Sequence, residues 1–437
     1  MSMLEMGYVS FPILLVMIFL RAPIGLAMML CGMGGLYFGM GGSTMVLAKL
    51  KNETYSTFSS YSLTIIPMFL LMGQFATLSG MSSALFKAAE SWLGHRKGGV
   101  AMAAVGACAG FGAICGSSLA TAATMSRVAL PELRQYGYAG GFSTATLAAG
   151  GTLGILIPPS VILVIYAILT EQNIAKLFLA AFIPGILAAI GYIITISIYV
   201  RVNPESAGTR EAVPMSERIK AMIDVWPVVL VFGLVVGGIY LGWFTPTEGA
   251  AVGAAGTGVI ALVSGNLSWE VFKESIIATA TSTAMIFFIV LGAAFYNSFL
   301  ALSQVPQELS QWVVGQGFSS WTVLLMILAF YLVFGCLMDS LSMILLTIPI
   351  FFPVISVLEF GMSPEHVAIW FGILVLIVVE VGLITPPVGM NLFIINAMDR
   401  STPMVETYKA VMWFVTSDLI RVVILVAFPA ITLFLIP

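Results

Sequence analysis

The sequence predicts an all-α polytopic membrane protein built as two inverted repeats, each with five crossings and one re-entrant helical hairpin. Of its 437 residues, 60% are hydrophobic and only 8% are charged, which leaves too little polar surface for a soluble protein of this size. Apolar stretches of membrane length recur along the whole chain. Two of these stretches are interrupted by a proline pair, and the pairs lie 228 residues apart.

The first interruption is Gly-Ile-Leu-Ile-Pro-Pro-Ser at residues 154–160. Pro158 and Pro159 remove two backbone donors and disfavour helix in the residues before them. In hydrocarbon, each carbonyl left unpaired costs on the order of several kcal/mol, so the break requires protein, water or an ion around it. Gly-Leu-Ile-Thr-Pro-Pro-Val at residues 382–388 repeats the pattern. Two such breaks are typical of an internally repeated transporter with its site at the breaks.

The first half is predicted to begin with a span that is retained, because Glu5 and no basic residue precedes the first apolar run. An amphipathic segment along the membrane interface and a hairpin turning at a Gly/Ser-rich stretch follow. In order, the predicted segments are spans at 7–20, 23–42 and 61–79, the interfacial segment 82–96, the hairpin 98–130 with its turn at 112–118, the broken span 139–169 and a span at 177–200.

Residues 201–224 hold four basic and four acidic residues and are predicted to link the halves. The second half then repeats the order of the first. Its predicted segments are spans at 226–244, 247–265 and 275–300, an amphipathic segment at 304–315, a hairpin at 320–355 turning near 335–342, a broken span at 366–397 and a last span at 411–436.

Matches between the halves support the repeat. Residues 111–117 align with residues 334–340 at an offset of 223. Trp92 aligns with Trp312 and Pro131 with Pro353 at nearly the same offset. The matches are few, but they keep their order along the chain.

The basic residues predict the orientation. Of 17 Lys and Arg residues, Lys49, Lys51 and Lys176 fall on one side, Arg421 falls inside a span, and the rest fall on the other side. The positive-inside rule makes the linker 201–224 cytoplasmic and places both termini outside. An odd number of crossings per half inverts the second half, so the two hairpins enter from opposite sides and their tips meet near the midplane.

The four cysteines are Cys31, Cys108, Cys115 and Cys336, and all lie in apolar stretches. This setting favours lone buried thiols over a disulfide framework or a metal site.

Two Gly/Ser turns and two proline breaks are expected to surround one central volume. Helix N-termini there suit an anion, whereas free carbonyls and hydroxyls suit a hard monovalent cation. The candidate cation ligands are Cys115, Ser117, Gly154, Ile157 and Pro159 in the first half, and Met338, Asp339, Ser340, Gly382 and Thr385 in the second. The candidates for solute contact are Gly116, Ser118, Ser160 and Pro387. Each of these small residues could instead serve close helix packing or bond the preceding turn.

Three ionisable groups lie deep in apolar sequence. Asp418 and Arg421 stand three residues apart and are predicted to form a structural helix pair. Asp339 sits in the second turn, which favours a functional role. For Glu380, coupling or gating and simple burial against a hydrogen-bond partner both stay open.

Other function classes fit less well. The Gly-His-Arg-Lys-Gly-Gly stretch at 94–99 lacks the spacing of a phosphate loop, which argues against an ATP-driven pump. His95 and His366 fall at segment edges, which argues against an intramembrane serine protease, so no enzymatic activity is expected. A channel stays open, because selectivity filters also use free carbonyls.

Four strings resemble the large membrane subunit of tripartite ATP-independent periplasmic (TRAP) transporters. They are GAICGSSLATAATM, GILIPPSVILVIYAI, DSLSMILLTIPIFFPV and GLITPPVGMNLF. The resemblance covers nearly the whole chain and implies a sodium-driven elevator importer with no cofactor besides Na⁺. It implies an organic acid as solute, with N-acetylneuraminate (sialic acid) expected and a C4-dicarboxylate as the alternative.

The resemblance also implies partners and a division of labour. The partners are a small membrane subunit, expected as a separate polypeptide because the chain starts at its first span, and a periplasmic binding protein in a bacterial inner membrane, with no nucleic acid. The segments expected are 1–96 (scaffold and arm), 97–169 (transport domain), 170–225 (connecting helix and linker), 226–316 (scaffold and arm), 317–398 (transport domain) and 399–437 (C-terminal helix).

Overall fold

The computed structural model describes residues 1–436 and is helical along nearly all of that length. Pro437, the end of the predicted segment 399–437, lies outside the described residues. The first half contains α1 (Met3–Phe19), α2 (Ile24–Gly39), α3 (Ser43–Phe58), α4 (Ile65–Leu78), α5 (Met81–Leu93), α6 (Gly99–Cys115), α7 (Ser118–Gln135), α8 (Gly140–Leu156), α9 (Val161–Thr170) and α10 (Ile174–Val202). The second half contains α11 (Met215–Ile223), α12 (Trp226–Phe232), α13 (Gly238–Tyr240), α14 (Pro246–Val263), α15 (Trp269–Ser303), α16 (Val305–Gly315), α17 (Ser320–Gly335), α18 (Ser340–Ser356), α19 (Pro364–Gly382), α20 (Met390–Met398), α21 (Met404–Ala427) and α22 (Pro429–Leu433).

The chain is a multi-pass membrane protein by helix length and composition. Within residues 1–436, seven helical segments are long and apolar enough to cross a bilayer, or eight if the bent pair α8 and α9 forms one span. α1 and α2 are apolar but have only 17 and 16 residues, at the lower end of the length that spans hydrocarbon.

Both proline pairs break their helices as predicted. α8 ends at Leu156, and α9 starts after Ser160 at an angle of 44°. α19 ends at Gly382, and α20 starts only after Gly389, which has a φ of +64° that suits glycine. Pro158–Pro159 and Pro386–Pro387 are both cis peptide bonds.

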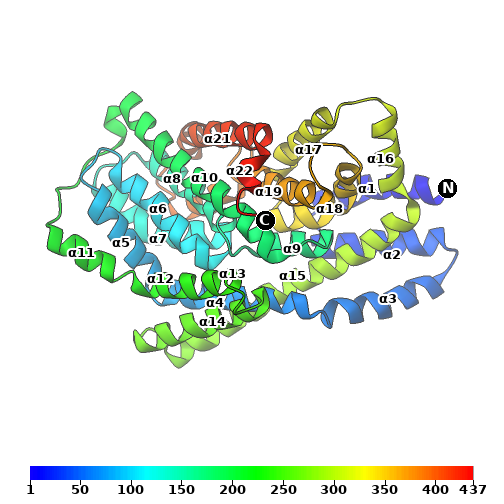
Figure 1. Ribbon diagram of the computed structural model, residues 1–437, viewed down its shortest axis with the longest axis horizontal. Helices are drawn as coiled ribbons and strands as arrows, with labels where there is room; N and C mark the ends of the chain where they lie inside the picture. The colour runs from blue at the N-terminus through cyan, green and yellow to red at the C-terminus, as the bar shows by residue number, and fades with distance from the viewer. Residues whose placement is uncertain (437) are drawn as a thin grey trace.

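The helices form two layers (Figure 1). One layer contains α3, α4 and α12–α15, in which α15 packs along α2 and α4 packs along α14. The other contains the two helix pairs α6–α7 and α17–α18 with the broken helices. There α7 contacts α20 and α18 contacts α9, so each pair contacts the broken helix of the other half as well as its own.

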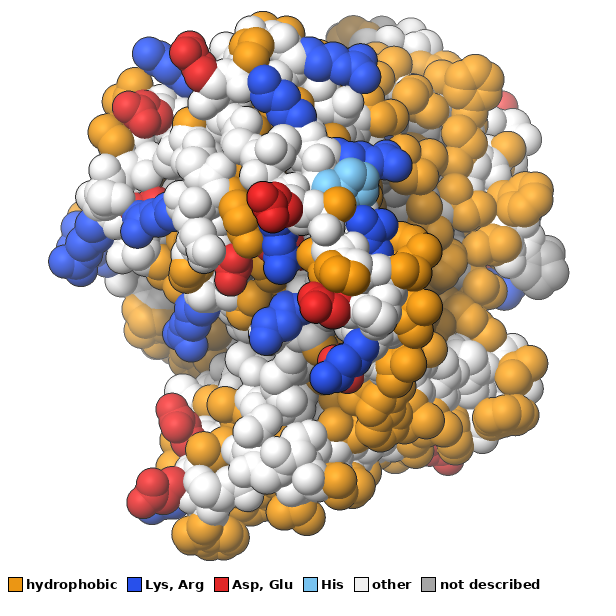
Figure 2. Space-filling model, turned by 90° about the vertical axis from the view of Figure 1, so that its left-hand side faces the viewer, with side chains coloured by type: hydrophobic (Ala, Val, Ile, Leu, Met, Phe, Trp, Pro, Cys, Tyr) orange, Lys and Arg blue, Asp and Glu red, His pale blue; other side chains and the backbone are white. Residues whose placement is uncertain are grey.

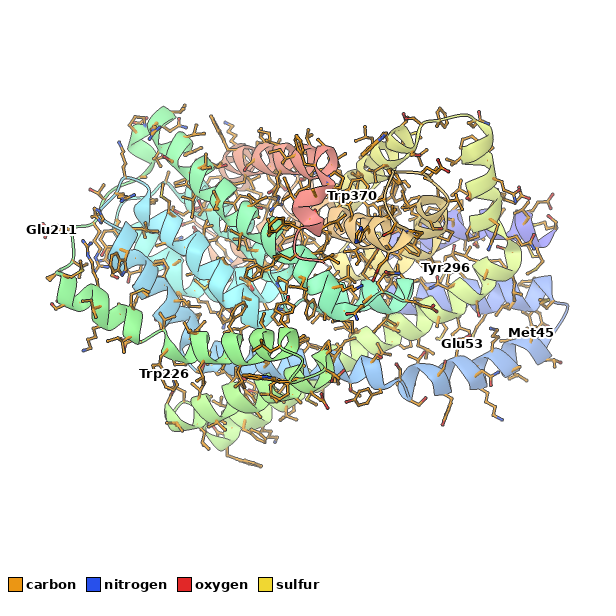
Figure 3. All side chains as sticks on the ribbon, in the orientation of Figure 1. Met45, Glu53, Glu211, Trp226, Tyr296 and Trp370 are labelled. Carbon is orange, nitrogen blue, oxygen red and sulfur yellow. The ribbon has the colours of Figure 1, made fainter. Side chains whose placement is uncertain are left out.

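Polar bonds and buried aromatic residues hold elements of the layers together. Ser10 on α1 lies 3.0 Å from the hydroxyl of Tyr296 on α15, which is fully buried. Trp370, the largest fully buried side chain, lies on α19 and donates from Nε1 to the Leu425 carbonyl at 3.0 Å. Figure 3 labels both Tyr296 and Trp370.

Several predicted boundaries were wrong. Residues 43–58 were left outside any predicted element, but they form α3, on which Figure 3 labels Met45 and Glu53. Lys49 and Glu53 of this helix both bond Ser298 of α15. The first hairpin continues to Gln135 rather than 130, with Pro131 inside α7. The linker is helical over α11. The last predicted span divides into α21 and α22, because Pro429 cannot continue the helix.

Other local predictions are confirmed. All four cysteines are free, and Cys108, Cys115 and Cys336 are buried. Arg421 and Asp418 form the expected i, i+3 ion pair at 2.9 Å. On α5, in the predicted interfacial segment 82–96, Glu90 is buried despite its charge and pairs with Arg210 at 2.8 Å.

Candidate functional site

The two hairpin turns meet at a single carboxylate. Ser118, the first residue of α7, donates its hydroxyl to Glu380 Oε2, and Ser340, the first residue of α18, donates to Glu380 Oε1 at 2.7 Å. Glu380 lies on α19, less than one turn before that helix breaks, and has no exposed surface. One side chain therefore joins residues that are 262 and 40 positions away along the chain.

Two helix N-termini partly offset the cost of burying Glu380. α7 and α18 both begin beside it, and helix N-termini carry partial positive charge. Each helix start is also capped by a side chain: Ser117 accepts from Ala120 N at 3.4 Å, and Asp339 accepts from Ser342 N at 3.0 Å and from the Ser342 hydroxyl at 2.6 Å. Both hairpin helices thus begin at one protein carboxyl group, and the predicted binding of an anionic solute at their N-termini stays a prediction.

The first hairpin packs tightly on the first break. A Cβ added to Gly112 would lie 2.5 Å from Gly154 Cα, and one added to Gly154 would lie 2.8 Å from the Ser117 carbonyl oxygen. Gly116, whose φ is +64°, faces the Pro159 carbonyl in the same way at 3.1 Å. Glycine at these positions lets two backbones and their carbonyls come together.

The second hairpin also packs backbone to backbone on the second break. A Cβ added to Gly335 would lie 3.4 Å from Gly382 Cα, but one added to Gly382 would lie 2.4 Å from the Gly335 carbonyl carbon. Gly389 N donates to the Cys336 carbonyl at 3.3 Å. Gly112 with Gly154 and Gly335 with Gly382 thus make the same kind of helix contact in the two halves.

The candidate cation ligands of the first half lie close together. Cys115 ends α6 and Ser117 precedes α7, while Gly154, Ile157 and Pro159 form the break against which this turn packs. Because position 158 is proline, the Gly154 carbonyl has no amide four residues ahead to accept from. The Cys115 carbonyl instead lies against Gly73 of α4, where an added Cβ would be 3.1 Å away.

The candidates of the second half have more protein partners. The Gly382 carbonyl accepts from Thr385 N at 3.0 Å, and the Thr385 hydroxyl donates to the Val381 carbonyl at 2.6 Å. Met338 is buried in the turn after α17, and Asp339 and Ser340 are bonded as described above.

Three of the four solute candidates are buried. Ser118 bonds Glu380, Gly116 faces Pro159, and Ser160 caps α9 by accepting from Leu163 N at 3.4 Å. Pro387 alone among them is exposed, and its carbonyl accepts from the Tyr408 hydroxyl at 2.7 Å.

Two further residues beside the breaks were not predicted. Thr121 Oγ1 and Asn391 Oδ1 are buried without a hydrogen-bond partner among the described residues. Thr121 follows Ser117 by one helical turn, a spacing that could have indicated it. Asn391 donates from Nδ2 to the Ala148 carbonyl at 3.2 Å and so connects α20 to α8. Nothing in the local sequence pattern signals that contact.

Hydrogen bonds connect α8, α10 and α21 next to the first break. Tyr192 donates to Asp418 Oδ2 at 2.7 Å, and its hydroxyl also lies 3.0 Å from Thr152 Oγ1 on α8. The groove between α10 and α21 beside Asp418 and Arg421 has a volume of about 710 Å³ but contains none of the predicted site residues.

Two ion pairs lie at the ends of the broken helices. Arg134 at the end of α7 pairs with Asp399, which follows α20, and Lys176 in the first turn of α10 pairs with Glu365 in the first turn of α19 at 2.6 Å. Burial alone would raise the pKa of Asp399, but hydrogen bonds from Ser401 and Thr402 and the Arg134 charge lower it below its ordinary value.

The candidate cation ligands at the tips are mostly carbonyl and hydroxyl oxygens. Among the described residues, no three His, Cys, Asp or Glu side chains gather in a way that could hold a metal ion. A cation at the tips would depend on carbonyl and hydroxyl oxygens, which suit a hard ion.

Comparison with known proteins identifies relatives over nearly the whole chain. Residues 11–431 match the family model "Tripartite ATP-independent periplasmic transporter, DctM component". The chain is 36% identical over 387 residues to the C4-dicarboxylate TRAP transporter large permease protein DctM of Pseudomonas aeruginosa, covering 88% of each chain. It is 28% identical over 430 residues to the sialic acid TRAP transporter permease protein SiaT of Haemophilus influenzae, covering 98% of this chain and 68% of that one.

The fold also matches a solved structure. The YdaH transporter of Alcanivorax borkumensis superposes with a TM-score of 0.66 at 15% identity, covering 89% of both chains. At this identity the match concerns the fold alone.

Proposed function

We propose that this chain, which belongs to the DctM component family of TRAP transporters, imports a small organic acid, with a C4-dicarboxylate favoured, in symport with sodium. The chain is a transporter permease and not an enzyme. The observation that carries the proposal is the meeting of both hairpin turns at Glu380, beside two broken helices. This arrangement places backbone carbonyls, hydroxyls and helix N-termini together, as a cation-coupled anion carrier requires.

The solute preference follows the relatives. The permease named for C4-dicarboxylates shares 36% identity with this chain, and the one named for sialic acid shares 28%. This difference favours a C4-dicarboxylate over the sialic acid expected from the sequence, which becomes the second candidate.

The proposed transport mechanism is an elevator. The moving part consists of residues 97–169 and 317–398, and the scaffold of residues 1–96 and 226–316, joined by 170–225 and followed by 399–437. The packing of α2 on α15 and of α14 on α4 supports inverted repeats, since each contact pairs an early helix of one half with the third span of the other.

The proposed orientation places the linker in the cytoplasm of a bacterium, with both termini on the periplasmic face of the inner membrane. Lys and Arg side chains gather at one end of the molecule (Figure 2), the end where Glu211 of the linker lies (Figure 3). Such a cluster is expected on the cytoplasmic side. The proposed partners are a small membrane subunit and a periplasmic binding protein that delivers the solute.

Uptake in proteoliposomes tests this proposal. The chain is reconstituted with its small subunit and binding protein, and radiolabelled succinate and sialic acid are supplied with an imposed inward sodium gradient. We expect saturable succinate uptake that stops when the gradient is collapsed. Sialic acid uptake alone would select the second candidate, whereas non-saturating flux without a gradient would indicate a channel.

A further inference from the structure

Glu380 is a buried acid without a basic partner. Its side chain has no exposed surface, and no Lys, Arg or His among the described residues lies within ion-pair distance of it. Asp418 and Arg421 form an ion pair on α21, a helix that packs against α19, and those two charges compensate each other. Asp339, the other acid at the tips, is occupied in capping α18.

Burying an unpaired carboxylate is costly unless polar groups replace its water. Here the replacement comes from two serine hydroxyls, one on each oxygen, and from the N-termini of α7 and α18. The hydrogen bonding of this carboxyl group therefore depends on both hairpins being in place. If either tip moves away, one carboxylate oxygen loses its partner.

Both bonded serines adjoin the candidate cation ligands. Ser118 follows Ser117 directly, and Ser340 is itself a candidate ligand beside Asp339. A cation that orders one turn would place that turn's serine against Glu380, and Glu380 would then favour the ordered position of the other turn. The Glu380 side chain thus connects the two turns directly.

We propose that Glu380 is a positioning residue that couples the two hairpin tips, so that a cation bound at one tip favours cation binding at the other. This inference rests on the proposed sodium-driven transport. It predicts that sodium acts with positive cooperativity, and that the cooperativity depends on a side chain that touches neither ion. Coupling of this kind typically changes affinity by about 5- to 150-fold.

The test compares Glu380→Gln with the unmodified protein in the reconstituted complex. Succinate uptake and the sodium-induced rise in thermal unfolding temperature are each measured against sodium concentration. We expect a Hill coefficient above 1 for the unmodified protein and close to 1 for Glu380→Gln, with a half-saturating sodium concentration raised about tenfold. A Hill coefficient unchanged by the substitution in both measurements would overturn the proposal.

Two further variants separate coupling from structure. Glu380→Asp keeps the charge but is one methylene too short to hold both serines, so we expect it to lose cooperativity as well; cooperativity retained in this variant would contradict the bridging role. It also replaces Glu380→Gln as the test variant if the latter does not fold. Asp399→Asn removes another buried acid away from the tips, and we expect lower stability with an unchanged Hill coefficient.

The failure of the proposed function would look different. In that case the unmodified protein itself would show uptake independent of sodium and no sodium-induced change in unfolding temperature.

Discussion

The two broken helices contain the same parts but differ in how they are enclosed. Residues 154–160 of the first break are all buried, and the hairpin beside them packs backbone to backbone. In the second break, Thr385 and Pro386 are half-buried and Pro387 is exposed, although the hairpin contact at Gly382 is just as close. An internal repeat can thus give two similar breaks unequal exposure.

Substitutions in the two hairpin turns test whether both candidate cation sites are needed for uptake. The first is capped by the Ser117 hydroxyl and the second by the Asp339 carboxylate, with shorter bonds. We expect Asp339→Ala to reduce sodium-driven uptake to background, and Ser117→Ala to do the same, although loss of either cap should cost only about 0.5–2 kcal/mol of stability. Uptake in proteoliposomes, with insertion and binding to the small subunit as controls, measures this. Normal uptake in both variants would mean that the turns serve packing alone.

The glycine contacts give the next largest effect. Gly112→Ala would place a methyl group 2.5 Å from Gly154 Cα, whereas Gly335→Ala would place one 3.4 Å from Gly382 Cα. We expect the first to lower the free energy of unfolding by about 1–3 kcal/mol and the matched second variant to change it little. Thermal unfolding in detergent compares the two, and equal losses would contradict this account of the two positions.

The two ion pairs at the ends of the broken helices, one buried and one exposed, are compared next. The Asp399 side chain is 1% exposed and bonded to Arg134, Ser401 and Thr402. We expect Asp399→Asn to cost about 1–3 kcal/mol near pH 7. Because folding lowers the pKa of Asp399, its contribution is present above about pH 4 and is lost as the pH falls through the lowered pKa. The stability difference from the unmodified protein should therefore shrink in acid, and a constant difference would contradict this account.

The ion pair between α10 and α19 should matter least. Glu365 and Lys176 are 47% and 30% exposed, so solvent and salt screen their attraction. We expect Glu365→Gln to change the free energy of unfolding by less than about 1 kcal/mol. The small loss should vanish at 1 M salt. A loss as large as that of Asp399→Asn would mean that the two pairs are equivalent after all.

The sequence predicted those features that depend on local chemistry. A proline pair in an apolar run ends the helix before it. Both breaks, at Pro158–Pro159 and at Pro386–Pro387, were therefore placed correctly. The spacing of Asp418 and Arg421 indicated their ion pair for the same reason. α3 was missed because its sequence is polar and lacks the length of a span.

Features that depend on distant contacts could not be predicted. Glu380 was recognised as a buried acid without a neighbour, but its partners lie 40 and 262 residues away. The unequal burial of the breaks depends on how entire helices pack, which a repeated motif does not encode. The buried pair of Glu90 with Arg210 was hidden for the same reason, because a linker residue covers a helix face that looks polar.

The 35 residues of α15 form one uninterrupted helix, about 52 Å long at the rise of an α-helix. Hydrocarbon is only about 30 Å thick, so a rod of this length must lean steeply or extend into the headgroups. It packs along α2, α3 and α4, and a change in its inclination would therefore shift those neighbours too. In a thinner bilayer, α15 should tilt further from the membrane normal. The transport rate should therefore vary with the acyl-chain length of the surrounding phospholipids.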